Sequence, residues 1–94
     1  MDVCDGGTIS GGSSSITFTN SHTTQFTINT PTNVNTGTDM PGWPATAPVV
    51  PAAHNGTAGS KVVQLSVNAQ SNNTYEYTTT PACPQGTNPR IVVS

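Results

Sequence analysis

Short runs of alternating apolar and polar residues recur along the chain, separated by turns rich in Gly, Ser, Asn and Pro. In residues 15–20, apolar Ile16 and Phe18 alternate with threonines. Residues 25–29 repeat the same pattern. A period of two residues is typical of a strand with one buried face. We therefore expect these two segments to form neighbouring antiparallel strands.

Further strands are predicted from β-branched and aromatic residues between turn signals. They cover residues 8–10, 47–50, 61–67, 75–77 and 90–93. In the third of these, Val63, Leu65 and Val67 fall on one face. Short strands at this spacing favour an all-β chain, a small Greek-key β-sandwich or barrel of about six to eight short strands.

The pattern weakens between residues 31 and 59, where prolines and glycines concentrate. Proline lacks the N–H that helices and central strands need, so only an edge strand at 47–50 is expected there. The remainder of 31–59 is predicted to be one long irregular loop. Loops of this length are often functional, so we expect the binding surface here.

Ninety-four residues suffice for a single domain, residues 1–94. Only 6% of the residues are charged and the formal net charge is −2. Two cations cannot follow a phosphate backbone, which argues against nucleic-acid binding. No apolar run reaches the length of a membrane span, so membrane insertion is not expected. The threonine-rich remainder suits the solvated faces of sheets.

The two cysteines, Cys4 and Cys83, are candidates for a disulfide. A bridge closing a loop of roughly 80 residues would stabilise so small a domain by about 4 kcal/mol. The alternative is a pair of free thiols. Cysteine use and the scarcity of lysine favour an oxidising compartment, so we expect a secreted, periplasmic or cell-surface protein.

Several segments, taken in order, resemble the cupredoxins, the plastocyanin- and azurin-type Greek-key domains. They are the strand at 8–10 with its Gly/Ser turn, the strand at 15–20, the Tyr75-Glu-Tyr-Thr-Thr79 run and the closing strand from Pro89 to Val93. The resemblance extends over about residues 8–94. It implies a cupredoxin-like β-sandwich with a ligand loop before the last strand.

The resemblance places the copper-ligand positions near Gln25, Thr79, Ala82 and residues 87–88. None of them carries a ligand of the expected type, and no histidine follows His54. A type-1 copper site needs a thiolate and two imidazoles. We therefore expect no cofactor, with a copper-binding or electron-transfer protein as the alternative.

The resemblance also bears on the N-terminal segment, residues 1–7. It implies that this segment lies at the same end of the sandwich as the ligand loop, so that Cys4 approaches Cys83 and tethers the segment. The family's first strand is reduced to Asp2-Val3, which predicts an uncovered sheet edge.

Candidate binding residues are Met40, Trp43 and His54. Trp43 lies between prolines, where its indole can form a contact platform for a sugar ring or a peptide, or can close one end of the core. His22 and His54 are weak candidates for a copper or zinc site. The alternative is that both are solvated turn residues.

Signals of catalysis are missing from the sequence. The serines at 13–15 lack the G-x-S-x-G pattern of a nucleophile elbow, and Asp39 and Glu76 lie far apart in the chain. We expect a non-enzymatic module with a structural, adhesive or partner-binding role. Its partner would be a protein or a carbohydrate. Self-assembly through an open sheet edge, as a surface or fibre subunit, is a further alternative.

Overall fold

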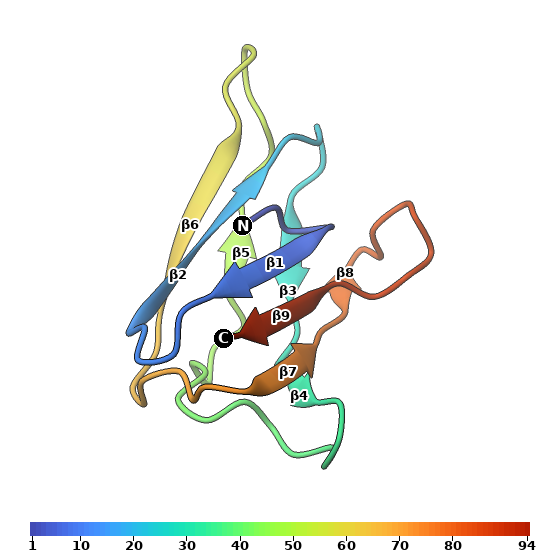
Figure 1. The fold of residues 1–94 in the computed structure, drawn as a ribbon. Helices are drawn as coiled ribbons and strands as arrows, with labels where there is room; N and C mark the ends of the chain where they lie inside the picture. The colour runs from blue at the N-terminus through green and yellow to red at the C-terminus, as the bar shows by residue number, and fades with distance from the viewer.

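The computed structural model describes residues 1–94 and contains nine short strands and no helix (Figure 1). The strands are β1 (Gly6–Ile9), β2 (Ser15–Asn20), β3 (Phe26–Ile28), β4 (Thr32–Asn33), β5 (Val49–Val50), β6 (Gly59–Gln64), β7 (Asn73–Glu76), β8 (Thr79–Thr80) and β9 (Arg90–Val93). The predicted all-β class and its small β-sandwich character are confirmed. None of the structure is a helix of the length and hydropathy needed to cross a membrane.

The strands form three hydrogen-bonded groups. One sheet has the order β1-β9-β7-β4, with β1 parallel to β9, a second pairs β2 with β6, and a third has the order β5-β3-β8. Isolated bridges from Asp2 to Thr19 of β2 and to Gly6 of β1 join the first two groups into one layer. In Figure 1, β3 and β5 lie behind β1 and β2, as the second layer.

The predicted pairing of residues 15–20 with residues 25–29 is wrong. β2 pairs with β6, whereas β3 pairs with β5 and β8, so the two strands belong to different sheets. Both strands bury their apolar residues in the same core, but they do so from opposite layers. Alternation identifies a strand with one buried face, and it carries no information on which strand lies beside it.

Asn20 holds the crossing between the layers and is completely buried. Its Nδ2 donates to the carbonyl oxygens of Thr24 at 2.8 Å and Pro51 at 3.2 Å. Its Oδ1 accepts from the backbone N–H of His22 at 2.9 Å. The side chain therefore fixes the turn after β2 and joins it to the segment that follows β5.

Several strand boundaries differ from the prediction, most clearly that of the strand expected at residues 61–67. The strand predicted at 61–67 ends at Gln64, and Val67 is 44% exposed although Val63 and Leu65 are buried. The chain turns away from β2 after Leu65, and the N–H of Ser66 donates to Gly42 instead. Within the segment 31–59, the short edge strand predicted at 47–50 is present as β5, at the edge of its sheet. The two-residue strand β4 was not predicted, so the segment is less irregular than expected there.

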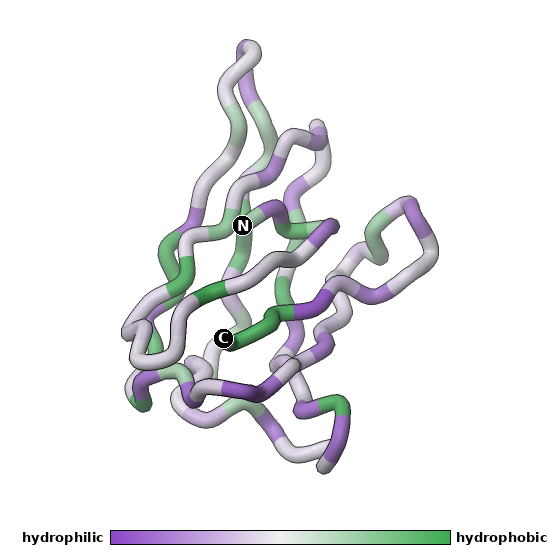
Figure 2. Tube along the Cα trace, in the orientation of Figure 1, coloured by the Kyte–Doolittle hydropathy of each residue, from purple (hydrophilic) through white to green (hydrophobic).

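The core is one cluster of sixteen buried hydrophobic residues. Phe18 lies at its centre, with the rings of Tyr77 and Trp43 packed edge-to-face against it at centroid distances of 5.9 Å and 6.2 Å. Figure 2 shows that β9 is hydrophobic over most of its length, while the loops around it are mostly polar or neutral. This distribution matches the central place of β9 between β1 and β7.

The predicted disulfide between Cys4 and Cys83 is confirmed, with the Cα atoms 5.7 Å apart. It ties the N-terminal segment to the β8–β9 loop, across a sequence separation of 79 residues. A disulfide is consistent with an oxidising compartment. Beside it, the buried hydroxyl of Tyr77 donates to the carbonyl of Val3 at 2.9 Å.

The N-terminal segment also covers the outer edge of β2. The N–H of Val3 donates to the carbonyl of Thr19 at 2.9 Å, and the N–H of Thr19 donates to the carbonyl of Met1 at 2.8 Å. The reduction of the first strand to Asp2-Val3 was expected to leave a sheet edge uncovered. For β2 this expectation is wrong, because residues 1–3 pair with its outer edge.

Reduction of the Cys4–Cys83 bridge should lower the free energy of unfolding by about 4 kcal/mol, because the unfolded chain regains the entropy of a long loop. Urea unfolding with and without a phosphine reductant measures this loss. A Cys4→Ser/Cys83→Ser double variant should match the reduced protein. Equal midpoints for the oxidised and reduced forms would contradict the prediction.

Replacing Tyr77 with Phe should destabilise the fold by about 1–3 kcal/mol, because the buried carbonyl of Val3 loses its donor. Burial, and then the carboxylates of Asp2 and Asp5, raise the pKa of the Tyr77 phenol above its ordinary value. The unfolded chain therefore ionises first as the pH rises, and the native protein should lose stability above about pH 10.

The Tyr77→Phe variant should lack this contribution to the alkaline loss of stability. Urea midpoints measured from neutral pH to beyond pH 10 provide the comparison. If the two proteins lose stability in parallel, the alkaline loss has another origin.

Candidate binding groove beside β6

A groove of about 480 Å³ runs between β6 and the segment that leads into β5. Its lining residues are Pro44, Thr46, Ala47, Pro48, Val49, Lys61, Val62, Val63 and Gln64. Val49 and Val62 are 41% and 49% exposed, which makes them two of the most exposed large hydrophobic residues of the protein. The groove therefore offers an apolar surface that the fold itself does not bury.

Proline accounts for the open side of this groove. Pro44 and Pro48 have no N–H, so the segment between them cannot form a continuous ladder with a neighbouring strand. β5 is two residues long and pairs with β3 on its inner side. No backbone hydrogen bond joins β5 or the segment before it to β6. The two walls thus approach each other without pairing.

The electrostatics of the groove are simple. Lys61 is the one charged residue that lines it, and the other polar groups are the Thr46 hydroxyl, the Gln64 amide and backbone atoms. Recognition there would rest on apolar contact and backbone hydrogen bonds more than on charge.

A smaller cavity of about 130 Å³ lies in the β8–β9 loop. It is lined by Thr78, Thr79, Ala82, Cys83, Gly86, Thr87, Asn88 and Pro89. Three of the copper-ligand positions implied by the cupredoxin resemblance line it, at Thr79, Ala82 and residues 87–88, whereas Gln25 does not. Its side-chain donors are neutral hydroxyls and an amide, and Cys83 is in the disulfide. Such donors do not match the soft ligands of type-1 copper.

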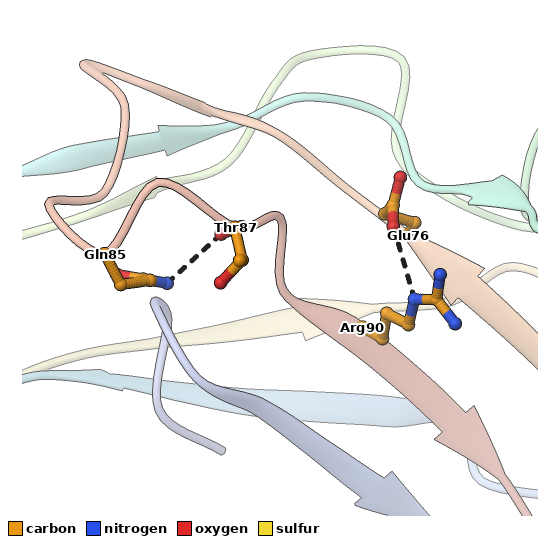
Figure 3. Close-up of polar contacts among 4 residues, drawn as sticks. All are labelled: Glu76, Gln85, Thr87 and Arg90. Carbon is orange, nitrogen blue, oxygen red and sulfur yellow. Dashed lines mark hydrogen bonds and ion pairs between the residues drawn. The ribbon is translucent and has the colours of Figure 1, made fainter.

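Contacts at the base of this loop hold it in place (Figure 3). The Gln85 side chain donates to the carbonyl of Cys4, and to the carbonyl of Thr87 at 3.4 Å. Arg90 and Glu76, on the adjacent strands β9 and β7, form an ion pair at 3.2 Å. Gln85 therefore attaches the loop to the N-terminal segment, and the ion pair joins the two strands beside it.

The structure separates the three predicted binding residues. Met40 is buried in the core, and the half-buried Trp43 side chain packs against the core cluster. His54 is exposed in the turn between β5 and β6, where its Nε2 lies 3.2 Å from the Asn55 amide. Binding by these three side chains stays a prediction, and they form no common surface with a cavity.

The two histidines proposed as weak metal ligands come to the same end of the molecule. The carbonyl of His22 accepts from the N–H of Ala53, the residue before His54, at 2.8 Å. The His22 ring packs edge-to-face on Phe26 at 5.5 Å. No group of three or more metal-ligating side chains occurs anywhere in the structure.

Comparisons with protein-family models, with curated proteins and with solved structures give no match. The cupredoxin relationship therefore stays a prediction.

The sequence placed the expected binding surface in residues 31–59, and part of that segment lines this groove. It did not predict that residues 61–64 would face that segment. Residues 47–50 and 61–67 were each predicted as strands, and one was predicted as an edge strand. A second signal was available in Val62, an apolar residue on the polar side of the alternation in residues 59–65. A single exposed valine becomes part of an apolar patch only if a neighbouring segment also presents apolar residues, and the sequence does not show which segment that is.

The indole of Trp43 serves the core at an energetic cost, because its Nε1 is buried without a hydrogen-bond partner. Trp43→Phe keeps a ring against Phe18 and removes the unpaired donor, so stability should change by less than about 1 kcal/mol. Trp43→Ala should cost about 2–3 kcal/mol through lost packing. Urea unfolding followed by circular dichroism measures both. An unchanged stability of Trp43→Ala would favour the contact-platform interpretation instead.

Proposed function

We propose that this domain is a non-enzymatic partner-binding module and that its contact surface is the groove between β6 and Pro44–Val49. The observation that best supports this proposal is the exposure of Val49 and Val62 on the two walls of one groove. Apolar clefts with a few polar groups are the usual form of binding sites. The low charge of this groove is matched by an uncharged, partly apolar partner.

A protein segment is the partner class that the groove favours. Carbohydrate binding commonly uses an aromatic ring as a stacking platform, and Trp43 instead packs against Phe18 in the core. The groove presents valines and prolines, and β6 beside it pairs with another strand on one edge only. These groups suit an extended polypeptide, which supplies both apolar side chains and backbone hydrogen bonds.

The domain would work outside the reducing cytosol, as a secreted, periplasmic or cell-surface module. The Cys4–Cys83 bridge supports this assignment, because disulfides persist in oxidising compartments. An adhesive or structural role on a surface is compatible with the same groove. Copper handling is the less supported alternative, since the cavity in the β8–β9 loop offers neutral oxygen and amide donors.

The test is selection of binding partners from displayed random peptides and from a glycan array, with affinities then measured on variants. Val49→Asp places a charge in the groove and should weaken the selected peptides by at least about tenfold. Val34→Asp is the matched control, because Val34 is 40% exposed and does not line the groove.

Peptides that bind both variants and the unaltered domain equally would contradict the groove as the contact surface. Selective, tight binding of glycans instead of peptides would contradict the proposed partner class.

A further inference from the structure

β6 has one paired edge and one free edge. Its residues pair with β2 in antiparallel register, and the N–H of Leu65 continues that ladder by donating to Ser14. Antiparallel ladders alternate between residues that bond inward and residues that bond outward. Since Leu65 bonds toward β2, residues 59, 61 and 63 do so as well, and the backbone groups of Ser60, Val62 and Gln64 point away.

These outward groups have no partner within the chain. None of the backbone or side-chain hydrogen bonds of the structure includes the N–H or the C=O of Ser60, Val62 or Gln64 outside the ladder with β2. The partner strand shows the same alternation, because Thr17 and Thr19 of β2 turn their backbone groups toward the N-terminal segment. In Figure 1, β6 forms a rim of the molecule with no strand beyond it.

The edges of β2, β4, β5 and β8 are covered or short, and β1, which is four residues long, is bonded to Asp2 at Gly6. The N-terminal segment pairs with the outer edge of β2. The chain at Thr38–Met40 folds back on β4, where Asn33 donates to Thr38 and Met40 donates to Pro31. β5 and β8 are two residues long, and prolines follow or flank them. Natural proteins usually cover or shorten such edges. β6 is six residues long and its outer edge is not covered, so we expect another strand to pair with it.

We propose that β6 pairs with β6 of a second copy of this chain in an antiparallel, two-fold symmetric dimer. This inference rests on the proposed function, in that β6 is one wall of the binding groove, and it names the partner. The three outward residues are symmetric about Val62. With Val62 opposite its own copy, Ser60 lies opposite Gln64, and each pair exchanges both bonds, which gives about six hydrogen bonds.

The side chains of β6 fit the same register. On the solvent face the exposed Val62 meets the Val62 of the other copy, so apolar surface is covered at the two-fold axis. On the inner face Lys61 lies opposite Val63, so no like charges are directly opposed. The groove runs along residues 61–64 and leaves the space beside this edge open.

The assembly stops at two copies. The pairing uses the same edge in both molecules, which closes the symmetry. The far edge of each β2–β6 pair is covered by its own N-terminal segment, so a third copy finds no free strand there. A contact of one six-residue strand per copy is small beside stable interfaces, which bury about 1,200 Å² or more. The dimer should therefore be weak and concentration-dependent.

Sedimentation equilibrium from about 10 μM to about 1 mM tests the stoichiometry. We expect a monomer–dimer equilibrium without larger species. Val62→Lys puts two ammonium groups opposite each other at the axis and should raise the dissociation constant at least about tenfold. Val92→Lys adds the same charge at another exposed valine, 39% exposed on β9, and should leave the equilibrium unchanged.

Amide hydrogen exchange supplies the residue-level readout. The amides of Ser60, Val62 and Gln64 should become protected as the concentration rises, while those of Lys61 and Val63, bonded to β2, should be protected throughout. A monomer at every concentration, a dimer insensitive to Val62→Lys, or growth beyond two copies would each overturn the pairing. Peptide binding that is sensitive to Val49→Asp would still stand in those cases, so the two proposals fail separately.

Discussion

The architecture depends on the attachment of the first four residues. Asp2 bridges both β1 and β2, and the segment around it pairs with Thr19, so these residues join the two sheets that make up the larger layer. The Cys4–Cys83 bond and the hydrogen bond from Tyr77 to Val3 hold that segment down. Without it the β2–β6 pair would contact the remaining strands mainly through side chains. A covalent bond thus secures a layer whose two groups of strands are joined through the hydrogen bonds of Met1, Asp2 and Val3.

The same segment determines where the molecule is open. By covering β2, it leaves β6 as the one long strand with an unpaired edge. Prolines keep the neighbouring segment from filling that edge, and the groove results. The opposite end, at the β8–β9 loop, is held by the disulfide and by Gln85, and its cavity is small. One end of the molecule is thus held by covalent and hydrogen bonds, and the other presents the unpaired edge of β6, the surface that we propose as functional.

The cupredoxin resemblance led to one expectation that the structure confirms, the approach of Cys4 to Cys83. That agreement concerns two residues, and a bridge between the first segment and the last loop is possible in many sandwiches. The relationship to the family and the loss of a metal site stay predictions. The properties argued from the structure, the groove and the free edge, do not depend on them.

Local pattern determined the elements of this protein, and tertiary structure determined their neighbours. The strands at 15–20, 26–28 and 90–93 follow from alternation and β-branched residues, because a half-buried strand imposes a period of two on its own sequence. Which strands pair, and hence which edge stays open, depends on chain crossings such as the one that Asn20 holds. The alternation of apolar and polar residues does not show where the chain crosses from one layer to the other, because strands of both layers face the same core. The sequence therefore predicted strands in both walls of the groove, but it could not predict that these walls would face each other.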